Sequence, residues 1–251
     1  MLQSERKQRI IELLQNGDFI KNKELERYLQ VSAATIRRDL TSLENDGLIK
    51  RIHGGAKIKI SNDQISQQEE LTMVRKYDLH SIEKQRIASY AASLVKDGDC
   101  IYIDSGSTPA YIYEYIAQKQ VIVVTNNMMV LQKVKPFDKA SVIIGAGEYN
   151  EQFRLVEGPL FIHTLTQFNY DHVFIGVNGI DLKTGQLTCT TLDASSVKKH
   201  ALSLSSHAYI VADSSKSKEK GIVTFAYTRE FDAILTTGIT NKYNVENIIN
   251  C

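Results

Sequence analysis

The chain has 251 residues, of which 43% are hydrophobic and 24% are charged, and its formal net charge is +1 at pH 7. This length exceeds that of a single small domain and leaves room for one further domain of ordinary size, so we expect two domains. No run of residues approaches the roughly 18 consecutive apolar residues of a membrane span, and the first residues form no hydrophobic signal segment. This favours a cytoplasmic protein with no membrane partner.

The three cysteines, Cys100, Cys189 and Cys251, are odd in number and widely separated. Their spacing excludes the paired-cysteine motifs of zinc sites and redox centres, so we expect no metal and no cofactor. Cys100 is interpreted as a core residue and Cys251 as part of a frayed tail. The sequence does not decide between these two roles for Cys189.

Two amphipathic helices are predicted at the start of the chain. The first begins at Ser4, a capping residue, and ends at Asn16-Gly17, where glycine supplies the left-handed conformation of a C-cap. After a short extended stretch at Phe19-Ile20, Asn22 is predicted to cap the second helix. The apolar residues assigned to the buried faces are Ile10, Ile11, Leu13 and Leu14 in the first helix and Leu25, Tyr28 and Leu29 in the second.

A third helix is predicted from Ser32, after a tight turn at Gln30-Val31. Ile36, Leu40 and Leu43 are spaced by four and three residues, so they form one stripe on a helix and predict its buried side. Ser32 is a good N-cap, and the positions outside the stripe include two small residues and two arginines: Ala33, Ala34, Arg37, Arg38 and Thr41. An arginine on such a helix can pair with phosphate or with the edge of guanine. The alternative is an ordinary solvated helix face.

Residues 48 to 59 predict a basic hairpin after this helix. Apolar and basic residues partly alternate there on either side of a Gly54-Gly55 turn. Residues 1 to 60 contain 12 Lys and Arg against 8 Asp and Glu, whereas the remainder contains 18 against 21. The excess of positive charge therefore lies in the segment that is predicted to bind DNA.

These residues resemble the N-terminal signature of the DeoR family of bacterial transcriptional regulators. The resemblance rests on Arg6, Ile10 and Leu14, on Ser32, Thr35 and the run from Ile36 to Leu40, and on the run from Lys50 to Ala56. It implies a winged helix-turn-helix in which Thr35, Arg37 and Arg38 face double-stranded operator DNA, with further residues on the wing. Asp39 is interpreted as orienting a neighbouring arginine or the helix rather than touching DNA, because a carboxylate repels phosphate. The predicted DNA-binding residues are Ser32, Ala33, Thr35, Arg37, Arg38, Lys50, Arg51 and His53.

The rest of the chain alternates short apolar runs with helical stretches. The runs are typical of buried parallel strands, which predicts an α/β sheet with helices on both faces. The predicted strands are residues 100–104, 121–125, 141–145, 172–176, 208–213 and 233–236, and the helices are residues 83–96, 109–118 and 193–206. In such sheets ligands bind beyond the carboxyl ends of the strands.

The first strand end has the clearest chemistry. The segment from Asp104 to Thr108 contains three hydroxyl side chains and several backbone N-H groups. It precedes Pro109, which is suited to the first position of a helix. Such a loop at the amino end of a helix can bind an anion. The alternative is a capped turn. Polar or glycine-rich residues also end four other strands, at Thr125-Asn126-Asn127, Gly145-Ala146-Gly147, Gly176 to Asp181 and Asp213 to Lys216. A phosphate favours N-H groups and a lysine, whereas sugar hydroxyls need acceptors such as Asp104, Asn126, Asp181 and Asp213.

This second part is similar to the sensor domain of the DeoR family, whose fold is shared with ribose-5-phosphate isomerase and CoA transferases. The resemblance implies that the loop from Asp104 to Thr108 holds the phosphate of a sugar. The predicted effector-binding residues are Lys84, Asp104, Ser105, Gly106, Ser107, Thr108, Thr125, Asn126, Gly145, Asp181, Lys198, Asp213 and Lys216. The chain departs from the family at Gly145-Ala146, where Gly-Gly is usual, and at Ala194, where a glutamate is usual. The second departure removes an acidic group near Lys198.

We therefore divide the chain into a winged helix-turn-helix at residues 1–59, a polar linker at 60–70 and a sensor and oligomerisation domain at 71–251. The leading interpretation is a repressor of a carbohydrate-metabolism operon that a phosphorylated sugar releases from its operator. Two alternatives remain: an isomerase-like enzyme, with Asp181 and Asp213 as candidate acid and base, and a constitutive DNA-binding protein whose larger domain only oligomerises. A homodimer is the minimum expected, because two half-sites double the DNA contacts, and a homotetramer is the alternative.

Overall fold

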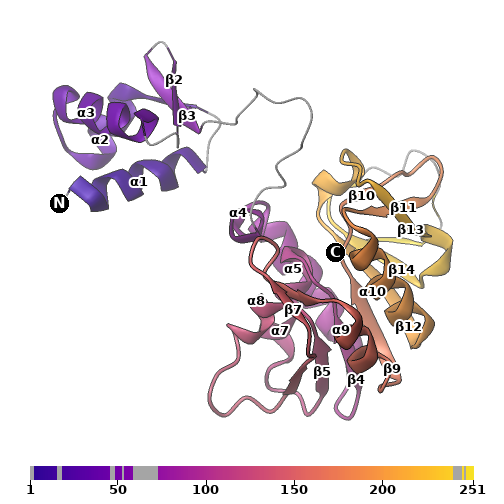
Figure 1. Cartoon of the computed structure of the whole chain (residues 1–251). Helices are drawn as coiled ribbons and strands as arrows, with labels where there is room; N and C mark the ends of the chain where they lie inside the picture. Colours follow the sequence, from indigo (N-terminus) through magenta and orange to yellow (C-terminus); the bar gives the residue numbers. More distant parts are fainter. Residues whose placement is uncertain are drawn as a thin grey trace. The chain divides into compact units, whose positions relative to one another are not determined.

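The computed structural model describes residues 3–15, 19–45, 49–52, 54–58, 73–239, 245 and 247–251. The chain forms two compact units, Met1–Glu70 and Leu71–Cys251 (Figure 1). The predicted linker at residues 60–70 lies outside the described residues. No helix among the described residues is long and apolar enough to cross a membrane.

The smaller unit contains three helices and a small sheet around one core. The helices are α1 (Gln3–Gln15), α2 (Asn22–Leu29) and α3 (Ala33–Asn45), and the strands are β1 (Ile20–Lys21), β2 (Ile49–Ile52) and β3 (Gly55–Ile58). The antiparallel strands lie in the order β1-β3-β2. Ile36, Leu40 and Leu43 are at most 2% exposed and pack against the buried residues of α1 and α2. This packing confirms the predicted buried stripe of the third helix.

Four local predictions for this unit are wrong. Helix α1 begins at Gln3, so Ser4 lies inside it, and Asn22 is the first residue of α2, whose cap position is Lys21. Tyr28 is 60% exposed, because it lies beside rather than on the stripe formed by Leu25 and Leu29. Gly55 is already part of β3 and pairs with Ile52, so the turn lies between these two residues.

The larger unit is organised around a parallel sheet, which confirms the predicted α/β architecture. Among the described residues the sheet has seven strands in the order β15-β14-β12-β9-β4-β5-β6, and every neighbouring pair is parallel. Its strands are β4 (Cys100–Ile103), β5 (Ile122–Thr125), β6 (Ser141–Ile144), β9 (Tyr170–Ile175), β12 (Ser205–Ala212), β14 (Ala233–Thr236) and β15 (Ile248–Asn250). All six predicted strands are present.

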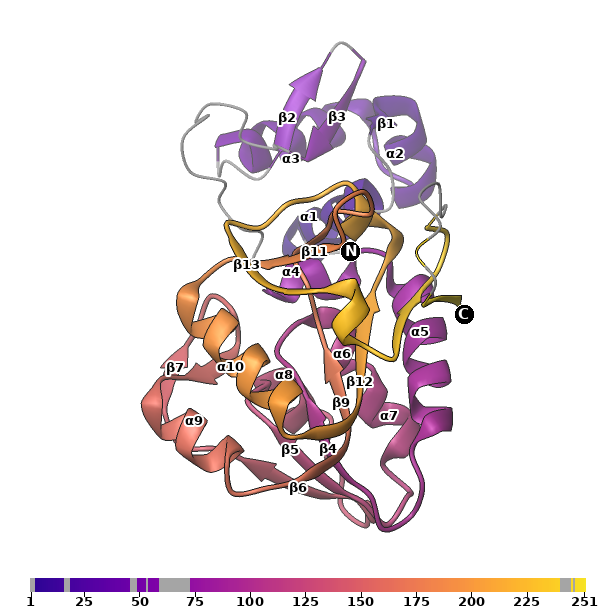
Figure 2. The ribbon, with the colours of Figure 1, turned by 90° about the vertical axis from the view of Figure 1, so that its right-hand side faces the viewer.

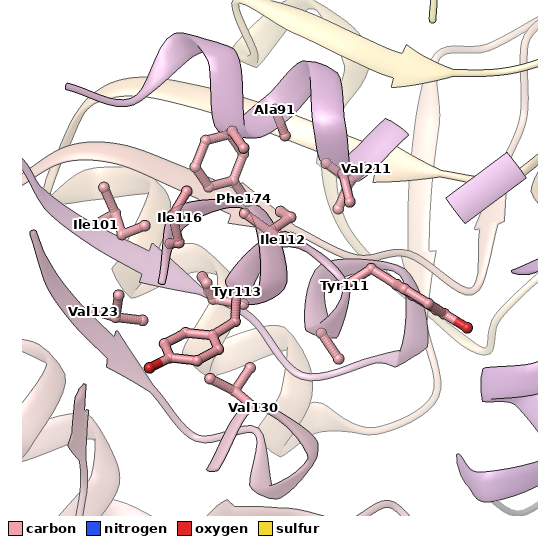
Figure 3. Close-up of a cluster of buried hydrophobic side chains, with 14 of the residues drawn as sticks. Ala91, Ile101, Tyr111, Ile112, Tyr113, Ile116, Val123, Val130, Phe174 and Val211 are labelled. Atoms are coloured by element: carbon pink, nitrogen blue, oxygen red, sulfur yellow. The ribbon is translucent and has the colours of Figure 1, made fainter. Parts of the chain in front are cut away.

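Helices cover both faces of this sheet. Alternate residues of a strand point to opposite faces, so Ile101 and Ile103 join one core cluster and Tyr102 joins the other. Figure 2 shows α5 and α7 on one side and α9 and α10 on the other, and Figure 3 shows the core under α5 and α7. The helices of this unit are α4 (Met73–Asp78), α5 (Ser81–Leu94), α6 (Ser107–Ala110), α7 (Ile112–Ile116), α8 (Met128–Leu131), α9 (Pro159–Leu165) and α10 (Leu192–Ser203).

Several short elements were not predicted. They are the hairpin of β7 (Glu148–Asn150) and β8 (Leu155–Glu157), the antiparallel sheet of β10 (Gly179–Ile180), β11 (Gln186–Cys189) and β13 (Val223–Tyr227), the 3-10 turns η1 (Ser214–Ser217) and η2 (Thr228–Glu230), α4, α8, α9 and β15. The cysteine at position 251 is not in a frayed tail, because its N-H donates to the carbonyl of Thr236 at 2.8 Å. Pro109 is the third residue of α6 rather than the first.

Candidate DNA-binding helix and strand-end site

The exposed side of α3 carries the predicted DNA-binding residues. The Ser32 hydroxyl accepts from the Thr35 N-H at 3.2 Å, which fits its predicted role as the N-cap. Ala33, Arg37 and Arg38 are exposed, and Thr35 is half-buried. Because Ile36 and Leu40 anchor the opposite side of the helix in the core, the two arginines project away from the unit.

The base of the hairpin is joined to α3. The Arg51 guanidinium donates to the Thr41 hydroxyl at 2.9 Å, and its backbone N-H donates to the Glu44 carboxylate at 2.9 Å. Arg51 is exposed but directed along the second half of α3. Lys50 lies in β2 opposite Lys57, and His53 lies outside the described residues.

Asp39 pairs with an arginine of another helix. Its carboxylate is fully buried and accepts from Arg6 on α1, with Nε at 2.5 Å and the second contact at 3.2 Å. Hydrogen bonding to Asp39 raises the pKa of Arg6. This two-point contact fixes α3 against α1, so Asp39 contributes to the orientation of the helix rather than to its outer surface.

In the larger unit, Asp104 and Lys198 form a buried ion pair at the end of β4. Asp104 is 1% exposed and Lys198 is 4% exposed. The same carboxylate accepts from the Gly176 N-H at 3.0 Å and from the Tyr102 hydroxyl at 3.1 Å. Lys198 also donates to the Gly176 carbonyl at 3.0 Å. The pair therefore joins the ends of β4 and β9 to α10, and the Asp104 carboxylate is surrounded by hydrogen-bond donors.

The loop after Asp104 is held by Asn127, a strand-end residue that is not among the predicted effector-binding residues. The Asn127 amide donates to the carbonyls of Asp104 at 3.0 Å and Gly106 at 2.9 Å, while its side-chain oxygen accepts from the Met129 N-H. Gly106 has a φ of +120°, which favours glycine, and Ser105 to Ser107 are half-buried while Thr108 is buried. The loop is thus a shaped turn before α6.

The side chains of Thr125 and Asn126 form hydrogen bonds with residues at neighbouring strand ends. The Thr125 hydroxyl donates to the Ile103 carbonyl at 2.6 Å. The side-chain oxygen of Asn126 lies 3.1 Å from the Tyr102 hydroxyl, whose single proton it shares with Asp104, and the Asn126 amide donates to the Val156 carbonyl at 3.1 Å. Both side chains are buried, so they position the strand ends around Asp104.

Lys84, Asp213 and Lys216 form a second group of charges. Lys84 on α5 is 2% exposed and donates to the Lys76 carbonyl. Burial lowers the pKa of Lys84 to about 8, the Asp213 carboxylate opposes this shift, and Lys216 adds to it. Asp213 accepts from the N-H and the hydroxyl of Ser215, and Lys216 pairs with Glu219 at 2.6 Å.

Two predicted effector residues have local structural roles. The exposed carboxylate of Asp181 accepts from the N-H groups of Lys183 at 2.9 Å and Thr184 at 3.2 Å, and bonding to Thr184 lowers its pKa. It therefore caps the turn between β10 and β11. At Gly145 an added Cβ would lie 2.4 Å from the Phe161 ring, so the close approach of α9 requires a glycine there.

Comparisons with known proteins cover both units. Residues 6–62 match the family model of the DeoR-like helix-turn-helix domain, and residues 79–238 match that of the DeoR C terminal sensor domain.

The chain is 34% identical over 227 residues to an uncharacterized HTH-type transcriptional regulator, FruR, of Bacillus subtilis, covering 90% of this chain and 88% of the relative. It is 29% identical to the glycerol-3-phosphate regulon repressor of Escherichia coli, covering 94% and 91%. A crystal structure of ribose 5 phosphate isomerase A from Neisseria gonorrhoeae is similar over 53% of this chain and 52% of that chain, with 18% identity and a TM-score of 0.39.

The structural role of Gly145 is testable. We expect Gly145→Ala to lower the free energy of unfolding of the larger unit by about 1–3 kcal/mol, because the methyl group collides with Phe161 in a packed core. Urea unfolding measures this cost, and adding Phe161→Leu should reduce it, because the ring atoms that collide are removed. A stable Gly145→Ala variant that no longer responds to a sugar phosphate would instead show that a ligand requires this glycine.

Proposed function

This chain belongs to the DeoR family of transcriptional regulators, and on that premise we propose that it represses a carbohydrate-metabolism operon until a phosphorylated sugar releases it from the operator. The observation that carries the DNA-binding half of this proposal is the pair of exposed arginines on a helix whose opposite side is fixed in the core. The observation that carries the effector half is Lys84, a buried ammonium with a carbonyl as its hydrogen-bond partner.

For DNA binding, we assign α3 to the major groove. Arg37 and Arg38 would pair with phosphate or with guanine edges, and Ser32, Ala33 and Thr35 would lie close to the bases at the amino end of the helix. Lys50, Arg51 and His53 would contact the backbone from the hairpin. The contact between Asp39 and Arg6 supports this assignment, because it fixes the angle of α3 within the unit.

For the effector, we assign the phosphate to the loop from Ser105 to Thr108 and to Lys84 and Lys216. Helix α5, which carries Lys84, contacts α6, whose first two residues are the last two of this loop. A buried ammonium is costly without an anionic partner, and a phosphate dianion supplies one. Asp213 is the acceptor that we assign to sugar hydroxyls. Asp104 and Lys198 would shape the site through their mutual pair, with Thr125 and Asn126 behind them.

We do not propose an enzyme, and the proposed function requires no cofactor. Isomerisation would need an acid and a base facing one substrate, and the Asp181 carboxylate is engaged by its own turn. We propose that the protein acts in the cytoplasm as a homodimer or homotetramer. Two copies would read half-sites about 34–36 Å apart, or a multiple of that distance.

The DNA-binding assignment predicts that Arg37→Ala and Arg38→Ala each weaken specific DNA binding. A contact to a guanine edge contributes about 1–3 kcal/mol, so the affinity should fall roughly 5- to 150-fold. The measurement is a gel shift with a duplex selected from a random library by the purified protein. Arg86→Ala, an exposed arginine of α5, is the matched control and should bind as the native protein does. Native affinity in both α3 variants would rule out the assignment.

The effector assignment predicts that at least one compound in a panel of pentose, hexose and amino-sugar phosphates raises the melting temperature and releases the selected duplex. Lys216→Gln should weaken this response roughly tenfold, because one charge-assisted hydrogen bond is lost. Lys218→Gln, an exposed lysine next to η1, is its control and should respond normally. If no compound in the panel shifts the melting temperature while the duplex is still bound, the larger unit is not a sugar-phosphate sensor.

A further inference from the structure

The last carbonyls of helix α4 accept hydrogen bonds from two side chains outside the helix. It begins at Met73, directly after residues 59–72, and it is the first described element of the larger unit. The Lys84 ammonium donates to the Lys76 carbonyl, and the Tyr111 hydroxyl donates to the Tyr77 carbonyl at 3.2 Å. The last carbonyls of a helix have no partner within the helix, so these two bonds satisfy groups that need outside donors.

The rings of Tyr77 and Tyr111 reinforce this contact. Their centroids are 4.2 Å apart and their planes differ by 5°. Lys133 lies over both rings, at 4.7 Å from Tyr77 and 5.1 Å from Tyr111, and it pairs with Glu114. At the other end of α4, Met73 is buried and its N-H donates to the Gln152 carbonyl at 3.3 Å. Met73 is therefore anchored independently of Lys84 and Tyr111.

Each donor lies in, or directly after, an element that carries an assigned effector residue. Lys84 is itself one of these residues, and Tyr111 follows α6, the helix that begins at Ser107 in the assigned phosphate loop. Helix α4 also contacts α6. The carboxyl end of α4 is thus attached to two parts of the site that would bind the effector phosphate.

Lys84 can exchange its neutral acceptor for a stronger one. Within the described part of the chain it donates to the Lys76 carbonyl, so no carboxylate is its hydrogen-bond partner there. With a pKa of about 8, Lys84 is mostly protonated at neutral pH. The carboxylates of Asp213, Asp78 and Glu83 attract its charge, whereas Lys216 repels it. A phosphate oxygen forms a charge-assisted bond that is stronger than the bond to a neutral carbonyl.

We propose that α4 couples the effector site to DNA binding: an anionic oxygen of the effector takes the Lys84 ammonium from the Lys76 carbonyl, and the carboxyl end of α4, pivoting at Met73, loosens. This inference rests on the proposed function, because it explains how the same site acts on the DNA-binding unit. In this mechanism the held form of α4 has the higher DNA affinity and the loosened form binds the effector. Tyr111 is a positioning residue that favours the held form without contacting either ligand.

The test is Tyr111→Phe, which keeps the stacked ring but removes the hydroxyl that holds Tyr77. Tyr113→Phe is the matched control, because its buried ring lies in the same core while its hydroxyl donates to Asp138 at 2.9 Å. The hydroxyl groups of Tyr111 and Tyr113 point in opposite directions (Figure 3). With no sugar phosphate present, we expect Tyr111→Phe to bind the selected duplex roughly fivefold more weakly, as the loss of one hydrogen bond predicts, and Tyr113→Phe to bind normally.

Hydrogen-deuterium exchange over residues 73–80 supplies the second readout. Tyr111→Phe and Lys84→Met should each increase deuterium uptake in this segment, and Tyr113→Phe should not. Inorganic phosphate should increase this uptake in the native protein and leave it unchanged in Lys84→Met. Native DNA affinity in Tyr111→Phe, an equal loss in Tyr113→Phe, or unchanged uptake up to the solubility limit of phosphate would each overturn the proposal. The DNA measurement contains no effector, so its result is independent of whether a sugar phosphate is the natural ligand.

Discussion

A charge that is removed from water needs a partner, and this requirement organises both units. In the smaller unit, Asp39 is fully buried and is paired with Arg6. In the larger unit, Asp104 is paired with Lys198. Removing one partner of such a pair leaves an uncompensated buried charge, which is strongly destabilising. Each pair also joins elements that are distant in the sequence, so the helix with the exposed arginines and the ends of the parallel strands are both positioned by buried ions.

Lys84 differs from these charges in a way that bears on function. It is as deeply buried as Lys198, but the described residues offer it a neutral carbonyl as hydrogen-bond partner, with the Asp213 carboxylate acting at longer range. Burial lowers the pKa of the Lys84 ammonium to about 8. In a protein that alternates between a ligand-free and a ligand-bound form, an incompletely paired ammonium is the group that gains most from an incoming anion. The same ammonium holds the helix that follows the DNA-binding unit in the chain.

The sequence predicted those features that depend on neighbouring residues. The stripe of Ile36, Leu40 and Leu43 and the six apolar runs of the sheet are periodic patterns, and periodicity reports which side of an element is buried. The pair of Asp104 and Lys198 joins residues 94 positions apart. Both are predicted to bind the effector, Asp104 from its place at a strand end and from the family resemblance, and Lys198 from the resemblance alone. No local pattern indicates that they bind each other. The role of Asn127 in holding the loop after Asp104 is not indicated by any local pattern either, and three-residue strands such as β15 are too short to show a period.

In the proposed function, a phosphorylated sugar weakens the binding of operator DNA, and operator DNA weakens the binding of the sugar. The most direct measurement is the dissociation constant of the selected duplex, by fluorescence anisotropy, across a titration with the sugar phosphate that most raises the melting temperature. We expect the dissociation constant to rise to a plateau roughly 5- to 150-fold higher. The duplex should weaken sugar-phosphate binding by the same factor, because coupling between two sites is reciprocal. A sugar phosphate that binds at the strand ends while the dissociation constant of the duplex stays constant would contradict the proposed function.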